Sequence, residues 1–161
     1  MMIQFKSILL AIILVLIAAI EFEGISQADP GLIVEKIEEP ALDALIRNPD
    51  NRIVVTFMAA WCWPCVDELP ALNKLYKKYN DQGLALIGIS IDLEGPQAIQ
   101  PIINEHKIRF PVYWYGDKAI TKFKLDAIPM LFFVRKGEIV EKVKGKRTER
   151  FLNKKFKEFL N

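Results

Sequence analysis

The chain contains two cysteines, Cys62 and Cys65, and only Trp63 and Pro64 lie between them. A disulfide that closes so short a loop removes little entropy from the unfolded chain, so it would stabilise the fold only weakly. The spacing is instead typical of a redox pair, in which one thiolate attacks a disulfide and the second thiol resolves the mixed disulfide. We therefore expect thiol–disulfide chemistry at this pair.

The elements on either side of the pair explain how the thiols would be activated. Residues 52–60 form an apolar run of strand length, and residues 66–79 have the spacing of an amphipathic helix. The start of a helix offers unpaired N–H groups and a positive dipole end, which favour a thiolate. We expect Cys62 to be the exposed nucleophile and Cys65, one turn inside the helix, to be the more buried resolving thiol.

A metal site is a poor explanation of the same residues. Structural zinc needs four ligands, and the chain supplies two cysteines and a single histidine, His106. We expect no metal and no cofactor other than the redox-active Cys62–Cys65 disulfide.

Hydrophobic patterning predicts an alternating β-α-β-α-β-α-β-α-β-β-α order. Such an order indicates a largely parallel central sheet with helices on both faces, closed by an antiparallel hairpin. The predicted strands are residues 32–37, 53–58, 84–91, 110–113, 130–135 and 138–144, and the predicted helices are residues 41–46, 65–79, 96–106, 119–123 and 147–160.

The first 28 residues have the layout of a secretory signal. Lys6 precedes an apolar run of 13 residues, Ile8 to Ile20, and Ser26-Gln27-Ala28 resembles a cleavage site. The run is shorter than the ~17–25 residues of a typical membrane span, although an uncleaved N-terminal anchor is the alternative. We expect residues 1–28 to be a signal peptide or membrane anchor and residues 29–161 to form one exported domain. The net charge of +2 argues against a nucleic-acid partner.

These motifs together resemble the thioredoxin superfamily, and specifically its exported TlpA/ResA group of thiol–disulfide oxidoreductases. The resemblance rests on four segments: residues 60–65, Glu68-Leu69-Pro70, the strand and helix material between about residues 92 and 110, and Ala127-Ile128-Pro129 before the final hairpin. It implies a thioredoxin-like mixed sheet with a TlpA-type insertion between the third strand and the hairpin. Thr56 stands where thioredoxin has a buried Asp, and this departure bears on the redox potential.

The resemblance also assigns roles to single residues. It implies a cis bond before Pro129, with the backbone of Ile128 pairing with a substrate strand. In the superfamily Trp61 packs beside the motif and forms an apolar rim for docking, which Trp63, unusually bulky for its place between the cysteines, would extend. Pro64 joins them among the expected substrate-binding residues.

Glu68 is the third candidate for a catalytic role, beside the two cysteines. It lies one helical turn after Cys65, where a carboxylate can accept the Cys65 proton during exchange. The alternative is a solvated surface carboxylate near Lys74 or Lys78.

The leading hypothesis is an extracytoplasmic enzyme of the periplasm, or of the outer face of the cytoplasmic membrane, that reduces disulfides in envelope proteins. The resemblance implies apocytochrome c as one such target, a membrane thiol donor that re-reduces the pair, and membrane association if the leader stays attached. The alternatives are a disulfide oxidant or isomerase, a peroxiredoxin-like peroxidase and a copper-delivery domain. Ala59 stands where the peroxidase would need Thr or Ser, and no His lies beyond His106 to serve a copper site.

Overall fold

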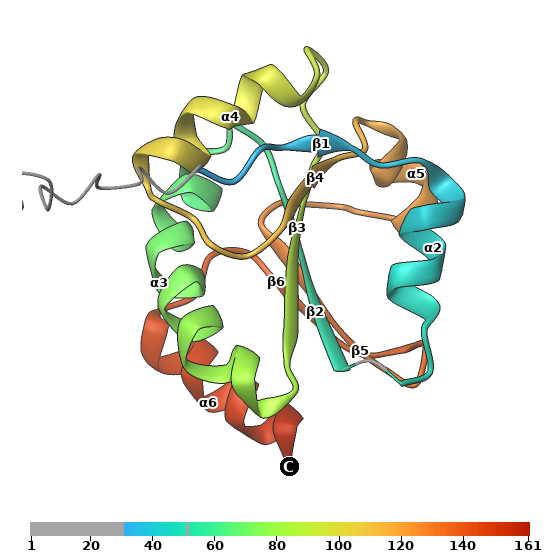
Figure 1. Ribbon diagram of the computed structural model, residues 1–161, viewed down its shortest axis with the longest axis vertical. Helices are drawn as coiled ribbons and strands as arrows, with labels where there is room; N and C mark the ends of the chain where they lie inside the picture. Colours follow the sequence, from blue (N-terminus) through green and yellow to red (C-terminus); the bar gives the residue numbers. More distant parts are fainter. Residues whose placement is uncertain (1–30, 51) are drawn as a thin grey trace, which may run out of the picture. The chain divides into compact units, whose positions relative to one another are not determined.

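A computed structural model describes residues 31–50 and 52–161 of the chain. The described residues form a six-stranded mixed sheet in the order β1-β4-β3-β2-β5-β6, with helices on both faces (Figure 1). This is a thioredoxin-like fold, as the motifs predicted. The strands are β1 (Glu35–Lys36), β2 (Arg52–Met58), β3 (Ala85–Ser90), β4 (Val112–Trp114), β5 (Met130–Arg135) and β6 (Glu138–Lys144).

The helices divide between the two faces of the sheet. In Figure 1, α3 (Trp63–Tyr79) and α6 (Glu149–Leu160) lie on one side, and α2 (Glu39–Arg47) and α5 (Lys118–Phe123) lie on the other. The fifth helix is α4 (Pro96–Glu105), and the loop that follows it is fastened to α3 because the Asn73 side chain bonds to the backbone of Lys107 and Arg109 at 3.0 and 2.9 Å.

Two neighbouring phenylalanines of β5 show how the core is divided into two layers. Successive side chains of a strand point to opposite faces. Phe132 accordingly meets Phe123 of α5, with ring centroids 6.2 Å apart, whereas Phe133 meets Phe156 of α6 at 5.8 Å. Both β5 rings are almost completely buried. The apolar run of residues 130–134 is thus explained by burial on both sides.

The predicted element order is confirmed, and the differences lie at the ends of strands and helices, where most bounds move by one or two residues. β1 has two residues where six were predicted, because among the described strands it pairs with β4 alone, itself three residues long. A strand at the sheet edge can extend only as far as its partner does. α4 and β4 lie between β3 and the final hairpin, in the region where extra material was expected. Their assignment to a TlpA-type insertion stays a prediction.

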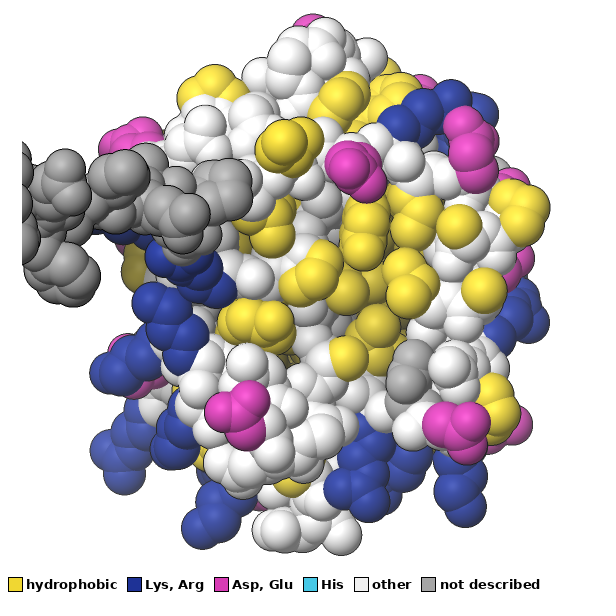
Figure 2. All heavy atoms as spheres, viewed as in Figure 1, with side chains coloured by type: hydrophobic (Ala, Val, Ile, Leu, Met, Phe, Trp, Pro, Cys, Tyr) yellow, Lys and Arg dark blue, Asp and Glu magenta, His cyan; other side chains and the backbone are white. Residues whose placement is uncertain are grey.

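One sheet edge is only partly covered. β4 pairs with Gly88–Ser90 of β3, so the first half of β3 has no neighbour on that side within the described chain. An apolar groove follows this edge, and Figure 2 shows hydrophobic side chains gathered between α2 and α3. Leu45, Tyr76, Ala85 and Tyr113 are among the residues that line it.

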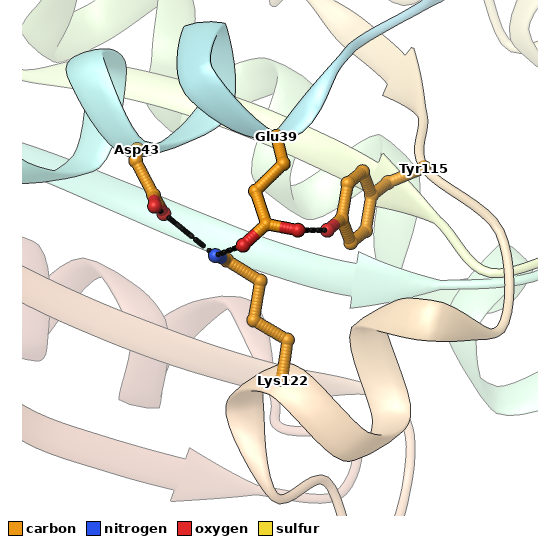
Figure 3. A network of polar contacts seen from close by, with 4 residues as sticks. All are labelled: Glu39, Asp43, Tyr115 and Lys122. Carbon is orange, nitrogen blue, oxygen red and sulfur yellow. Dashed lines mark hydrogen bonds and ion pairs between the residues drawn. The ribbon is translucent and has the colours of Figure 1, made fainter.

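A polar cluster joins α2 to α5, the two helices on the same side of the sheet (Figure 3). Lys122 donates to Glu39 at 2.7 Å and lies 2.9 Å from an oxygen of Asp43. The Tyr115 hydroxyl donates to the second oxygen of Glu39 at 3.0 Å. Because Tyr115 follows β4 directly, the cluster ties three separate segments of the chain together.

The predicted leader, residues 1–28, lies outside the described residues. Among residues 31–50 and 52–161, the structure contains no helix with the length and apolar character to cross a bilayer.

Candidate active site

The Cys62–Cys65 pair lies at the junction between the end of β2 and the start of α3. The N–H of Cys62 donates to the carbonyl of Ala59 at 3.1 Å, which closes a tight turn directly after the strand. Cys62 is the N-cap residue of α3, and its own carbonyl accepts from Cys65 and Val66 at 2.9 and 3.1 Å. Pro64 fits in the first helical turn, because the N–H that it lacks has no partner within the helix at that position.

The two sulfur atoms form a disulfide with an S–S distance of 2.05 Å. Cys62 is 5% exposed and Cys65 2% exposed, so both are buried in this state. The expectation of an exposed Cys62 is therefore wrong for the disulfide form, in which Cys62 and Cys65 both belong to the buried hydrophobic core. Cys62 is still the more accessible of the two cysteines, as predicted.

Three large apolar side chains close to the pair face solvent. Trp61 is 66% exposed and Trp63 is 74% exposed, as expected for an apolar rim. Leu93 is 71% exposed and was not singled out from the sequence. It follows Asp92, whose carboxylate contacts the backbone of Ala60, so Leu93 and Trp61 extend from adjoining parts of the chain. We call Trp61, Trp63 and Leu93 the apolar rim.

Glu68 is buried, with 1% of its surface exposed. Its Oε1 accepts a hydrogen bond of 2.6 Å from the N–H of Arg147, and its Oε2 has no partner among the described residues. Burial raises the pKa of Glu68 to about 7, against the opposing effect of the Arg147 N–H and of the charges on Lys146 and Arg147. A carboxyl group with this pKa can exchange protons near neutral pH.

The alternative reading of Glu68 as a solvated surface group is wrong. Lys74 pairs with Glu149 at 2.6 Å, and Lys78 donates to Asn153 at 2.9 Å, so both lysines are engaged with α6. Glu68 instead faces the segment that connects β6 to α6.

The peptide bond between Ile128 and Pro129 is cis, as the resemblance implied. The Pro129 carbonyl accepts from the N–H of Gly145 at 2.8 Å, which fixes the loop against the end of β6. Ile128 is partly buried, and within residues 31–50 and 52–161 no hydrogen bond engages its backbone. Its N–H and C=O are therefore available to another chain.

Strand register brings these segments to one end of the sheet. Met58 of β2 pairs with Ser90 of β3, and Phe57 pairs with Met130 of β5. The turn that carries Cys62, the residues after Ser90 and the cis proline before Met130 must therefore adjoin. The sequence motifs predicted the first and third of these segments, and the second was missed.

The missed segment contains a fully buried carboxylate, Asp92. Its Oδ1 and Oδ2 accept from the N–H of Ala60 at 2.9 and 3.1 Å, and Oδ2 also accepts from the Ser90 hydroxyl at 2.7 Å. The signal in the sequence was an acidic residue that directly follows the apolar run 84–91. The described residues contain no group of three His, Cys, Asp or Glu side chains placed to hold a metal.

Comparison with characterised proteins agrees with this geometry. The chain is 29% identical over 127 residues to the thiol-disulfide oxidoreductase ResA of Bacillus thuringiensis (strain Al Hakam), which covers 78% of this chain and 72% of that protein. It is 27% identical over 165 residues to ResA of Oceanobacillus iheyensis, a match that covers 89% of this chain and 85% of that protein.

Solved structures share the fold. StoA from Bacillus subtilis matches with a TM-score of 0.60 at 24% identity, over 68% of this chain and 84% of that chain. A putative thiol:disulfide interchange protein DsbE from Chlorobium tepidum matches with a TM-score of 0.65 at 19% identity, over 70% of this chain and 82% of that chain. The AhpC/TSA family matches residues 29–143. With its Cys62–Cys65 pair, the chain is a thiol–disulfide oxidoreductase of thioredoxin-like fold, and it belongs to the AhpC/TSA family.

Proposed function

We propose that this protein reduces disulfides in proteins of the cell envelope, with Cys62 as the nucleophile and Cys65 as the resolving thiol. The observation that carries the proposal is the pair at the start of α3, at the sheet end that also carries the cis proline, where the Ile128 backbone has no hydrogen bond among the described residues. The relatives named ResA support the thiol–disulfide chemistry. The apolar run at residues 8–20 supports export.

The reaction proceeds in two exchanges. The Cys62 thiolate attacks one sulfur of the target disulfide, a mixed disulfide forms, and the other target sulfur leaves as a thiolate. Cys65 then loses its proton and attacks the Cys62 sulfur, which releases the second target thiolate and closes the Cys62–Cys65 disulfide. The target gains two electrons and takes up two protons, and the enzyme is left oxidised.

Glu68 is the group that we assign to the Cys65 proton. It is one helical turn from Cys65, it is buried, and its Oε2 has no hydrogen-bond partner in the described chain. A pKa of about 7 leaves a substantial fraction of Glu68 ionised at neutral pH and ready to accept a proton. The role is that of a general base in the resolving step.

The substrate surface consists of the apolar rim and the Ile128 backbone. Exposed aromatic side chains beside a reactive group favour a polypeptide substrate, because they supply contact area at a low entropic cost. The N–H and C=O of Ile128, unbonded in the part of the chain that the structure describes, would pair with an extended strand of the target by β-augmentation. A protein disulfide fits both features, and apocytochrome c is one target of this kind.

A reductant in an oxidising compartment needs a source of electrons. We therefore propose a membrane thiol donor that re-reduces the Cys62–Cys65 disulfide after each cycle. The enzyme would act outside the cytoplasm, either free in the periplasm or held at the outer face of the membrane by its N-terminal segment.

The reduction potential of the Cys62–Cys65 pair tests the direction of electron flow. Equilibration with dithiothreitol or glutathione buffers should give a value close to that of reducing thioredoxins, about −270 mV. A value near that of strong oxidants, about −120 mV, would show that the protein donates disulfides and would overturn the proposal.

A trapping experiment tests the class of substrate. The Cys65→Ser variant cannot resolve mixed disulfides, so in the native envelope it should accumulate proteins linked through Cys62. The Cys62→Ser variant is the matched control and should trap none. Recovery of only low-molecular-weight thiols on Cys62 would contradict a protein substrate.

A further inference from the structure

The turn between β2 and Cys62 depends on a side chain from a different strand. β2 ends at Met58. The Met58 carbonyl accepts the last hydrogen bond between β2 and the β3 side of the sheet, donated by the N–H of Ile91 at 2.9 Å. The N–H of Ala60 lies beyond this ladder and has no backbone partner in the described chain. It donates to both carboxylate oxygens of Asp92, at 2.9 and 3.1 Å.

Asp92 is itself held from two sides. The Ser90 hydroxyl donates to Oδ2 at 2.7 Å, and the Trp114 indole Nε1 donates to the Asp92 carbonyl at 2.7 Å. The residue has no exposed surface. A buried carboxylate in a fixed position is a rigid acceptor, since both its side chain and its backbone are anchored.

The position of this acceptor matters for the thiol pair. Ala60 is two residues before Cys62, and Ala59 accepts the bond from the Cys62 N–H at 3.1 Å. The turn therefore has one fixed point at each end, the Asp92 carboxylate and the first turn of α3. Without the first of these, the chain before Cys62 would gain conformational freedom in the reduced protein and lose it again each time the disulfide closed.

We propose that Asp92 is a positioning residue for Cys62, because its hydrogen bonds to the Ala60 N–H hold the turn in the shape from which the Cys62–Cys65 disulfide closes. The inference rests on the oxidoreductase chemistry of the pair but on no particular substrate or direction of electron flow. Among the described residues, Asp92 makes its hydrogen bonds to Ala60, Ser90 and Trp114 and none to either cysteine. It would act by lowering the entropy that ring closure costs.

Equilibration with glutathione measures this effect directly. In the balanced reaction, the dithiol and one glutathione disulfide give the Cys62–Cys65 disulfide and two glutathione thiols. Asp92→Ala should lower the equilibrium constant roughly three- to ten-fold, because disulfide closure must then order a turn that Asp92 keeps ordered in the natural reduced protein. The fraction oxidised is read by mass spectrometry after acid quenching and alkylation.

Two further variants separate positioning from other roles. Asp92→Asn keeps an acceptor oxygen for the Ala60 N–H, so its constant should lie within about two-fold of the natural protein's. Ser90→Ala loosens Asp92 but leaves both Ala60 bonds in place, so it should lower the constant less than Asp92→Ala does. If Asp92→Asn and Asp92→Ala shift the constant equally, charge and not hydrogen bonding is responsible, and the proposal is wrong.

If Asp92→Ala folds and the constant is unchanged, Asp92 serves only the fold and the proposal is likewise overturned. Should Asp92→Ala fail to fold, amide exchange of the natural protein carries the test. The Ala60 N–H should exchange at least roughly 100-fold more slowly than an unprotected amide in both redox states, because a buried carboxylate holds it. Exchange at the unprotected rate would contradict the proposal. A failure to trap envelope proteins would leave each of these results unaffected.

Discussion

The N–H of Arg147 donates a 2.6 Å hydrogen bond to Oε1 of Glu68, across 79 positions of the chain. This bond joins the active-site helix to the segment between β6 and α6. The same segment holds the cis-proline loop, because the N–H of Gly145 donates to the carbonyl of Pro129. The proposed base beside Cys65 and the proposed substrate-binding loop are thus attached to one short piece of backbone.

The buried Glu68 predicts a specific dependence of stability on pH. Its pKa is raised from 4.5 to about 7, so between these values the folded state keeps a proton that the unfolded state loses. The free energy of unfolding contributed by Glu68 must therefore fall as pH rises through this window, by about 3 kcal/mol in total. The loss is complete above the folded-state pKa.

Denaturant unfolding of the disulfide form checks this prediction. The free energy of unfolding of Glu68→Gln minus that of the natural protein should rise by about 3 kcal/mol from pH 4.5 to above pH 7 and then level off. Glu158→Gln, which changes a half-exposed carboxylate of α6, is the control. A difference that stays constant across the whole range would show that Glu68 titrates as an ordinary exposed carboxyl.

The proposed proton transfer predicts that Glu68→Gln slows one step only. Resolution of the mixed disulfide by Cys65 should slow roughly ten- to hundred-fold at pH 7, because the general base is lost. The first attack by Cys62, measured in a Cys65→Ser background, should change less than about three-fold. Single-turnover reduction of a fluorescent disulfide, followed by rapid mixing, separates the two steps. Equal slowing of both steps would place Glu68 outside the resolving chemistry.

The apolar rim predicts a difference between large and small substrates. Trp63→Ala should raise KM for a protein disulfide roughly ten-fold, because an exposed aromatic anchor is lost. Reduction of a small disulfide such as cystine should change little. Val140→Ala is the matched control, since Val140 is 56% exposed but lies on β6, toward the end that pairs with Val134 and Arg135, away from the cis proline. Identical effects on both substrates would argue against docking on this surface.

The α2–α5 cluster predicts a modest contribution to stability. Lys122 is only 18% exposed and pairs with both Glu39 and Asp43, so Lys122→Ala should lower the free energy of unfolding by about 1 kcal/mol. Lys36→Ala removes a pair with Glu38 in which both side chains are mostly exposed, and it should cost less than about 0.5 kcal/mol. Thermal and denaturant unfolding give both values. Equal losses in the two variants would show that burial of Lys122 adds nothing.

The sequence was sufficient for the parts of the site that depend on local patterns. An apolar strand, a Cys-x-x-Cys pair and an amphipathic helix occur in succession, so the position of Cys62 at the helix start could be predicted without tertiary information. The β5–β6 hairpin was predicted with its observed bounds, because Lys136-Gly137 marks the turn between two strand patterns. Both residues have positive φ there, which Gly137 adopts at little cost.

The parts that were missed depend on contacts between distant segments. In the sequence Asp92 is simply the first polar residue after a predicted strand. Its hydrogen bond to Ala60 depends on the register of β2 against β3, which the sequence pattern does not reveal. The burial of Glu68 likewise depends on the β6–α6 segment, 79 positions away. Cys62 was expected to be exposed from its place at the helix start, whereas its burial depends on the core residues that distant segments pack around it.

Alkylation of the reduced protein tests the central claim most directly. Iodoacetamide should modify Cys62 before Cys65 at every pH from 5 to 9, and the midpoint of the Cys62 rate profile should lie below the value of a free thiol, about 8.5. Mass spectrometry of the peptides identifies the modified sulfur. Modification of Cys65 first, or a Cys62 midpoint at or above that of a free thiol, would contradict the assignment of Cys62 as the activated nucleophile.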